Sequence, residues 1–285
     1  MTVSAETFAY VADLVRRSSA IRLDAGKEYL VESRLAPLAR TAGVPDVDAY
    51  VTRVRRSRDV RAHDEVVEAM TTNETSWFRD VGPFAALRER ILPNWTASAV
   101  PGSRLRVWSA ACSTGQEPYS IAMVLADSAV RGASILATDL STQVLERARQ
   151  GTYTQLEVNR GLPAPMLVRH LTREGTGWQV ADELRRAVTF QRHNLLDPAP
   201  RGGPFDVVFL RNVLIYFDLE DRRGVLERVH RVLRPGGWLL LGAAETPVGV
   251  HDGFERVVVG RTTAYRATAS SPAAAPVPTT LRGAP

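Results

Sequence analysis

Two carboxylates follow two successive apolar runs in the middle of the chain, and their spacing is typical of a nucleoside site. The first run, at 107–110, leads through small residues and Gly115 to Glu117, where we expect a helix to begin. Small residues in that turn would let a ligand lie against the backbone. The second run ends in Asp139, roughly 20 residues further on, where doubly wound folds bind a ribose diol. The turn lacks the G-x-G-x-x-G glycines of a pyrophosphate site, so the pair predicts a nucleoside cofactor rather than a dinucleotide.

The elements that would position these carboxylates alternate between strand and helix. Hydrophobic periodicity predicts strands at 104–110, 134–139, 187–193, 205–211 and 237–243, and helices at 117–130, 141–150 and 219–233. A final antiparallel pair is expected at 254–259 and 262–267, and the Pro/Gly residues of 234–237 should end the last helix. Strands that alternate with helices form a parallel sheet with right-handed crossovers. We therefore expect an α/β fold built on a doubly wound, mostly parallel sheet.

Other segments depart from this alternation. Residues 1–70 carry apolar side chains at helical spacing and predict an N-terminal helical domain, followed by a linker and a helix at 71–100. Residues 152–186 hold Gly and Pro between short mixed runs, which predicts a small antiparallel β insertion within the sheet domain at 101–268. Residues 269–285 are rich in Ala, Pro, Ser and Thr and predict a disordered tail.

The composition is that of an ordinary globular protein. The chain has 285 residues, of which 45% are hydrophobic and 24% charged, and its net charge of +5 permits an acidic partner without naming one. The single cysteine, Cys112, excludes an internal disulfide and suits a reducing compartment. No Cys/His cluster has metal-ligand spacing, so we expect no metal. With no signal-peptide pattern and no apolar run of about 20 residues, we expect a cytoplasmic protein without direct membrane insertion.

Several long motifs carry a family resemblance. They are TTNETSWFRD at 71–80, VWSAACSTGQEPYS at 107–120, FDVVFLRNVLIYF at 205–217, RLDAGKEYLVESRL at 22–35 and ATDLSTQVLERARQGTY at 137–153. In their order along the chain these motifs resemble those of the chemotaxis receptor methyltransferases of the CheR type. The resemblance implies a class I methyltransferase sheet that binds S-adenosylmethionine and releases S-adenosylhomocysteine, with an N-terminal helical domain and a β insertion. It also implies methylation of glutamate side chains on methyl-accepting chemoreceptor cytoplasmic domains; we expect a monomer that binds no nucleic acid.

The same resemblance implies roles for residues around the first two strands. Glu117 would contact the methionine amino group of the cofactor, and Asp139 its ribose. Asn73 and Thr75 would help to close over the cofactor, while Arg79 would reach the cofactor's carboxylate end and the substrate. The alternatives are structural: Glu117 as a first-turn glutamate that stabilises its helix, and Asp139 as a cap for the helix that follows it.

Residues after the third and fourth strands complete the predicted cofactor site. Asn194 would read the edge of the adenine while Leu195 packs on its face, although Asn194 could also be a turn residue. Arg211 and Asn212 end the fourth strand, at the carboxyl edge of the sheet where open α/β folds bind ligands. We therefore assign both of them to cofactor binding.

The expected reaction needs an oriented carboxylate more than a base. A glutamate carboxylate is ionised at neutral pH and can attack a sulfonium methyl group without a general base or a metal. We predict that Arg79 and Tyr216 are catalytic, because their hydrogen bonds could aim that carboxylate in line with the S–CH₃ bond. The structural alternatives are a surface charge for Arg79 and a core aromatic for Tyr216. A methyltransferase that acts on an amine or an alcohol would need a convincing base.

A basic run near the third predicted helix includes Arg53 and Arg56. Such a run is usually a solvated face, but here it could dock the acidic receptor helices. Two other functions stay open: a methyltransferase of the same fold with another protein, a nucleic acid or a small molecule as its acceptor, and a non-catalytic module that senses the cofactor or docks receptors. The motif RNVLIY at 211–216 lacks the D/N-P-P-Y/F loop used on base amines, and the presence of Arg79 and Tyr216 favours catalysis.

Overall fold

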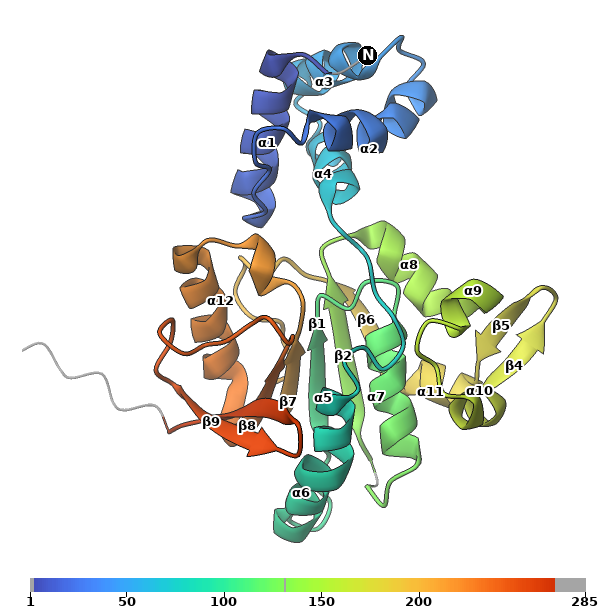
Figure 1. The fold of residues 1–285 in the computed structure, drawn as a ribbon, viewed down its shortest axis with the longest axis vertical. Helices are drawn as coiled ribbons and strands as arrows, with labels where there is room; N and C mark the ends of the chain where they lie inside the picture. Colours follow the sequence, from blue (N-terminus) through green and yellow to red (C-terminus); the bar gives the residue numbers. More distant parts are fainter. Residues whose placement is uncertain (1–2, 131, 270–285) are drawn as a thin grey trace, which may run out of the picture.

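Four amphipathic helices form the N-terminal part of the molecule and stand over one end of an α/β layer (Figure 1). This computed structural model describes residues 3–130 and 132–269, so the predicted disordered tail lies outside the described residues except for residue 269. The four helices are α1 (Ala5–Ser19), α2 (Glu28–Thr41), α3 (Val47–Arg56) and α4 (Val60–Met70). Side chains of Ser4, Asp46 and Asp59 cap α1, α3 and α4 by accepting hydrogen bonds from first-turn amides.

A seven-stranded sheet forms the centre of the larger domain, in the order β6-β2-β1-β7-β8-β10-β9. Its strands are β1 (Arg106–Ala110), β2 (Ser134–Asp139), β6 (Val188–Arg192), β7 (Phe205–Leu210), β8 (Leu233–Leu241), β9 (Phe254–Val259) and β10 (Thr262–Ala267). The first five strands in this order pair in parallel, and β10 runs antiparallel to both of its neighbours. The predicted α/β class with a mostly parallel sheet is confirmed.

Helices cover both faces of this sheet because its strands are apolar on both sides. One face packs against α7 (Gln116–Ala126) and against the segment α5 (Gly82–Ala86), η1 (Leu87–Ile91) and α6 (Leu92–Ser98); the other packs against α12 (Leu219–Val232). The remaining sheet helix is α8 (Thr142–Gln150), which follows β2. From β1 the chain continues to β2 and β6 on one side and later returns to β7 on the other. Such a switch point opens a crevice at the carboxyl ends of the strands.

The end of α12 differs from the expectation in one respect. The helix ends at Val232, as the Pro/Gly residues predict, but β8 begins immediately at Leu233 rather than at 237. Pairing of β8 with β7 is interrupted by a bulge between Phe205 and Val207, which accommodates the extra residues of the Pro/Gly segment.

The β insertion contains more structure than the predicted hairpin. Its three strands are β3 (Thr152–Thr154), β4 (Leu171–Glu174) and β5 (Gly177–Val180), in the order β3-β5-β4, and its helices are α9 (Gln155–Val158), α10 (Ala164–His170) and α11 (Asp182–Ala187). The backbone of Gly161, in the β insertion, packs closely against the linker before α5. Its φ is +97°, and an added Cβ would clash with the carbonyl oxygen of Trp77. Only glycine fits this approach.

Candidate active site

A cavity at the carboxyl edge of the sheet gathers side chains from both domains. Its walls come from the end of α1, from the linker after α4 and from the segments that follow β1, β2, β6 and β7. The lining includes all ten predicted cofactor-binding and catalytic residues: Asn73, Thr75, Arg79, Glu117, Asp139, Asn194, Leu195, Arg211, Asn212 and Tyr216. It does not include Arg53 and Arg56, which are exposed on α3 at the end of the helical domain farthest from the sheet (Figure 1).

Asp139 dominates one side of the cavity, which we call the β2 end (Asp139 with Ser113 and Ser141). The side chain is almost fully buried, and its two oxygens accept hydrogen bonds from the backbone amides of Ser113 (2.8 Å) and Ser141 (3.0 Å). Burial raises the pKa of this carboxyl, and the amides oppose the rise. Because amides are neutral, they orient the carboxylate without cancelling its charge, so it can still accept hydrogen bonds from a pair of hydroxyls.

The turn after β1 contains small residues, but they serve two different purposes. Ala111, Cys112 and Ser113 line the cavity, as expected for a turn that a ligand approaches. Gly115, at φ +95°, instead faces the β insertion, where an added Cβ would lie 2.9 Å from the hydroxyl oxygen of Tyr153. This glycine is therefore required for packing rather than for ligand approach.

Arg211 organises the opposite side, the β7 end (Arg211, Glu117, Asp80, Arg79 and Ser109). Its side chain is 1% exposed and donates from Nη1 to Glu117 Oε2 (2.9 Å) and from Nη2 to Asp80 Oδ2 (2.7 Å). It also donates to the carbonyl oxygen of Arg79 at 2.7 Å, while Ser109 Oγ donates to Glu117 Oε1 at 2.8 Å. Burial raises the pKa of Glu117, and the charge of Arg211 is the largest effect that opposes it.

The charges at the β7 end suit a ligand that carries both an ammonium and a carboxylate. The guanidinium of Arg211 between the carboxylates of Glu117 and Asp80 leaves these three groups with one net negative charge, which favours a cationic group. The guanidinium of Arg79, which also lines the cavity, favours an anionic group. The buried Nε–H of Arg211 has no hydrogen-bond partner in the part of the chain that the structure describes. These residues therefore fit the amino-acid portion of S-adenosylmethionine, and Asp139 fits its ribose.

The two predicted catalytic side chains are half-buried at the cavity wall. Arg79 donates from Nη1 to the carbonyl oxygen of Glu74 at 3.1 Å, and Tyr216 lies in a single 3-10 turn, η2 (Leu214–Tyr216). Within residues 3–130 and 132–269, the hydroxyl of Tyr216 makes no hydrogen bond. Both groups thus keep donors for a molecule that enters the cavity.

Glu245 supports the cavity wall from behind without lining the cavity, and sequence reasoning missed it. It follows β8, is 9% exposed, and accepts four backbone hydrogen bonds of 2.7–2.9 Å, from the amides of Asn212, Val213, Leu214 and Gly242. Asn212 has a φ of +57°, which is rare for a residue other than glycine and is held here by the carboxylate. A carboxylate just beyond an apolar run, as at Asp139, was the signal that could have identified it.

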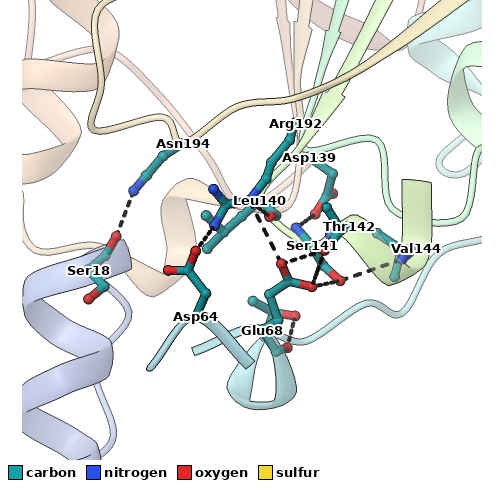
Figure 2. A network of polar contacts seen from close by, with 11 residues as sticks. Ser18, Asp64, Glu68, Asp139, Leu140, Ser141, Thr142, Val144, Arg192 and Asn194 are labelled. Atoms are coloured by element: carbon teal, nitrogen blue, oxygen red, sulfur yellow. Dashed lines mark hydrogen bonds and ion pairs between the residues drawn. The ribbon is translucent and has the colours of Figure 1, made fainter. Parts of the chain in front are cut away.

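The side chain of Asn194 already has partners on both of its polar atoms. Its Nδ2 donates to the carbonyl oxygen of Ser18 at 2.6 Å (Figure 2), and its Oδ1 accepts from the amide of Leu196 at 3.1 Å. The geometry gives Asn194 a contact with the helical domain; its reading of a base edge stays a prediction. The side chain of Arg53 also has a partner within the chain, because its Nη1 donates to the carbonyl oxygen of Ala42 at 3.0 Å.

Two further features concern the described ranges, 3–130 and 132–269. No helix there is long and apolar enough to cross a membrane. No three His, Cys, Asp or Glu side chains within the same ranges gather in a way that could hold a metal ion.

Comparison with known proteins identifies the family. Residues 6–71 match the CheR methyltransferase all-alpha domain, and residues 73–262 match the CheR methyltransferase SAM binding domain. The chain is 41% identical over 275 residues to chemotaxis protein methyltransferase 1 of Pseudomonas aeruginosa. The matched region covers 94% of this chain and 100% of that protein. It is 41% identical over 251 residues to chemotaxis protein methyltransferase Cher2 of Pseudomonas putida, covering 85% of this chain and 91% of that protein. With both domains matched in order and the cavity in place, the chain belongs to the CheR methyltransferase family and is an S-adenosylmethionine-dependent methyltransferase.

Proposed function

We propose that this enzyme transfers a methyl group from S-adenosylmethionine to glutamate side chains on the cytoplasmic domains of methyl-accepting chemoreceptors. The products are glutamate 5-O-methyl ester and S-adenosylhomocysteine. The observation that carries this proposal is that Arg79 and Tyr216 both line the cavity and keep hydrogen-bond donors for an acceptor that enters it. Such a wall suits an acceptor that is already an anion.

The chain's own groups would bind and aim the two reactants. The bound cofactor supplies an electrophilic methyl group on a positively charged sulfur. Asp139 accepts hydrogen bonds from the ribose hydroxyls, and Glu117 accepts from the ammonium of the methionine portion. Tyr216 and Arg79 donate to one oxygen of the acceptor carboxylate and leave the other free to attack. Because Arg79 is only half-buried, its charge is screened, so it orients the nucleophile without greatly weakening it.

An amine or alcohol acceptor is the main competing substrate class, and it would need a base. His193 is the one histidine among the described residues that line the cavity, and burial lowers its pKa, so it is neutral at pH 7. However, His193 follows β6, while Arg211 and Tyr216 follow β7, and β2 and β1 lie between these two strands. A base on the far side of the crevice does not serve an acceptor held by Tyr216, which favours a carboxylate.

Receptor docking is proposed to involve the exposed end of α3. Arg53 and Arg56 are exposed there and would meet the acidic methylation helices of the receptor. The same proposal implies a cytoplasmic location, since the receptor domains that accept methyl groups lie in the cytoplasm.

The direct test is transfer of labelled methyl groups from S-adenosylmethionine to purified receptor cytoplasmic domains. We expect incorporation that is released as methanol by mild alkali, since carboxyl methyl esters hydrolyse in base and N-methyl groups do not. Receptor domains with their acceptor glutamates changed to alanine are the matched control and should incorporate nothing. Alkali-stable label, or equal label on the alanine variant, would refute glutamate as the acceptor.

A further inference from the structure

Glu68, near the end of α4, reaches from the helical domain to the first turn of α8 (Figure 2). Its carboxylate accepts hydrogen bonds from the backbone amide of Thr142 (3.0 Å), from the hydroxyl of Thr142 (2.7 Å) and from the hydroxyl of Ser141 (3.1 Å). The side chain of Glu68 is 15% exposed; its hydrogen bond with Ser141 is partly buried, and its hydrogen bonds with Thr142 lie at the surface. An amide in the first turn of a helix has no partner within the helix, and Glu68 supplies one from another domain.

The residues that Glu68 holds are the ones that orient Asp139. The backbone amide of Ser141 donates to Asp139 Oδ1 at 3.0 Å, and the hydroxyl of Ser141 also caps α8. Leu140, between them, packs against the hydrophobic core of the helical domain. The segment 139–142 is thus fixed on its outer side by the helical domain, while the inner side of Asp139 faces the cavity. Glu68 itself lies outside the cavity lining.

A second set of contacts lies beside this one. Arg192, at the end of β6, makes an ion pair of 3.0 Å with Asp64 on α4 and lies 3.8 Å from Glu68. Its Nε also donates to the carbonyl oxygen of Leu140 at 3.2 Å (Figure 2). Asp64 binds Arg192 without touching α8, which makes it a natural control for Glu68.

We propose that Glu68 is a positioning residue for the cofactor: by holding Ser141 and Thr142 it fixes the amide that aims Asp139 at the ribose. The proposal rests on the proposed use of Asp139 at the ribose and extends it to the helical domain. It makes the helical domain part of the cofactor site, although Glu68 touches no cofactor atom.

One effect of Glu68 acts in the opposite direction. Its negative charge lies near Asp139 and helps to raise the pKa of that carboxyl, although burial is the larger cause. Removing the charge alone should therefore make the Asp139 carboxyl ionise slightly more easily. Removing the hydrogen bonds should leave that carboxylate less well oriented. We expect the hydrogen bonds to dominate, because Arg192 partly offsets the charge and the bonds act directly on the backbone that carries Asp139.

The test measures S-adenosylhomocysteine binding by calorimetry, which needs no receptor and so stands even if the acceptor proves to be different. Glu68→Ala should weaken binding by about 5- to 20-fold, as expected for loss of several hydrogen bonds to a charged group. Glu68→Gln keeps an acceptor oxygen for the Thr142 amide and should weaken it less. Asp64→Ala should change the affinity by less than about twofold, since it removes only a half-exposed ion pair.

A double-mutant cycle separates positioning from general destabilisation. In an Asp139→Ala background, Glu68→Ala should have no further effect on the affinity, because the group that it positions is gone. In turnover, Glu68→Ala should raise KM for S-adenosylmethionine with kcat at saturation nearly unchanged. An equal effect of Glu68→Ala in both backgrounds, or a loss in Asp64→Ala as large as in Glu68→Ala, would each overturn the proposal.

Discussion

The β2 end and the β7 end of the cavity each bury one carboxylate, but they compensate for its burial in different ways. Asp139 is held by the neutral backbone amides of Ser113 and Ser141. Glu117 is held by the guanidinium of Arg211, which it shares with Asp80. In both carboxyls burial raises the pKa. The difference therefore lies in the partner and not in the depth of burial.

This difference fits what each end is proposed to bind. Ribose hydroxyls are neutral donors, and a carboxylate that keeps its full charge between two amides accepts from them well. The amino-acid portion carries charges of both signs, and a guanidinium between two carboxylates offers both signs in return. The β7 end also joins the linker to β7 through Arg211, so it should contribute to folding as well as to binding. The β2 end should contribute mainly to binding.

Loss of Arg211 should give the largest effect. Arg211→Ala leaves the carboxylates of Glu117 and Asp80 without their cation, and breaking a buried pair in this way costs about 3–5 kcal/mol of unfolding free energy. Arg211→Lys should lose less, because it keeps the charge but cannot reach three acceptors at once. Denaturant unfolding measures the free energy of unfolding of both variants.

The matched control for that prediction is a cation near the β2 end. Arg192→Ala removes a guanidinium that is 44% exposed, so it should cost below about 1 kcal/mol of unfolding free energy. If Arg192→Ala proved as damaging as Arg211→Ala, the contrast between the two ends would not hold.

Loss of Asp139 should be the next largest effect, and it should appear in binding. Asp139→Ala leaves ribose hydroxyls without an acceptor and should weaken S-adenosylhomocysteine binding by about 1–3 kcal/mol, or about 5- to 150-fold. Asp139→Asn should unfold somewhat more easily than the parent, because the NH2 group of Asn cannot accept a hydrogen bond from the amide of Ser113 or Ser141, but it should lose less unfolding free energy than Arg211→Ala. Calorimetry and denaturant unfolding on the same samples separate the two quantities. Unchanged affinity in Asp139→Ala would remove the ribose assignment.

Local sequence signals were sufficient for most of the sheet and for Asp139 and Arg211, whereas Asn73, Thr75 and Arg79 were predicted only through the family resemblance. Apolar runs mark β1, β2 and β7, and the side chains at their carboxyl ends line the cavity, so Asp139 and Arg211 could be placed from the sequence. The partners of these residues could not. Asp80 lies 131 positions from Arg211, and no local pattern joins them. Glu68 lies 73 positions from Ser141, and its role depends on how the two domains meet.

Loss of the Tyr216 hydroxyl should give a smaller effect that is confined to turnover. Tyr216→Phe removes one orienting hydrogen bond and should lower kcat by about 2- to 12-fold, which corresponds to about 0.5–1.5 kcal/mol. Stability and S-adenosylhomocysteine affinity should hardly change, because the hydroxyl makes no hydrogen bond within the described residues 3–130 and 132–269. Turnover equal to that of the parent would assign Tyr216 to packing alone.

Charge reversal on α3 should give the smallest effect, and it should change neither end of the cavity. Arg53→Glu with Arg56→Glu should raise KM for the receptor domain by about two- to fivefold at low salt, since exposed charge pairs are weak and screened. Reversal of Arg90 and Arg186, which are exposed on η1 and α11, changes the net charge equally and is the control. Cofactor affinity should be the same in all of these proteins, because α3 contributes nothing to the cavity lining. Docking through α3 would be excluded if both double variants raised KM equally, or if the KM of the α3 variant matched the parent across a salt series.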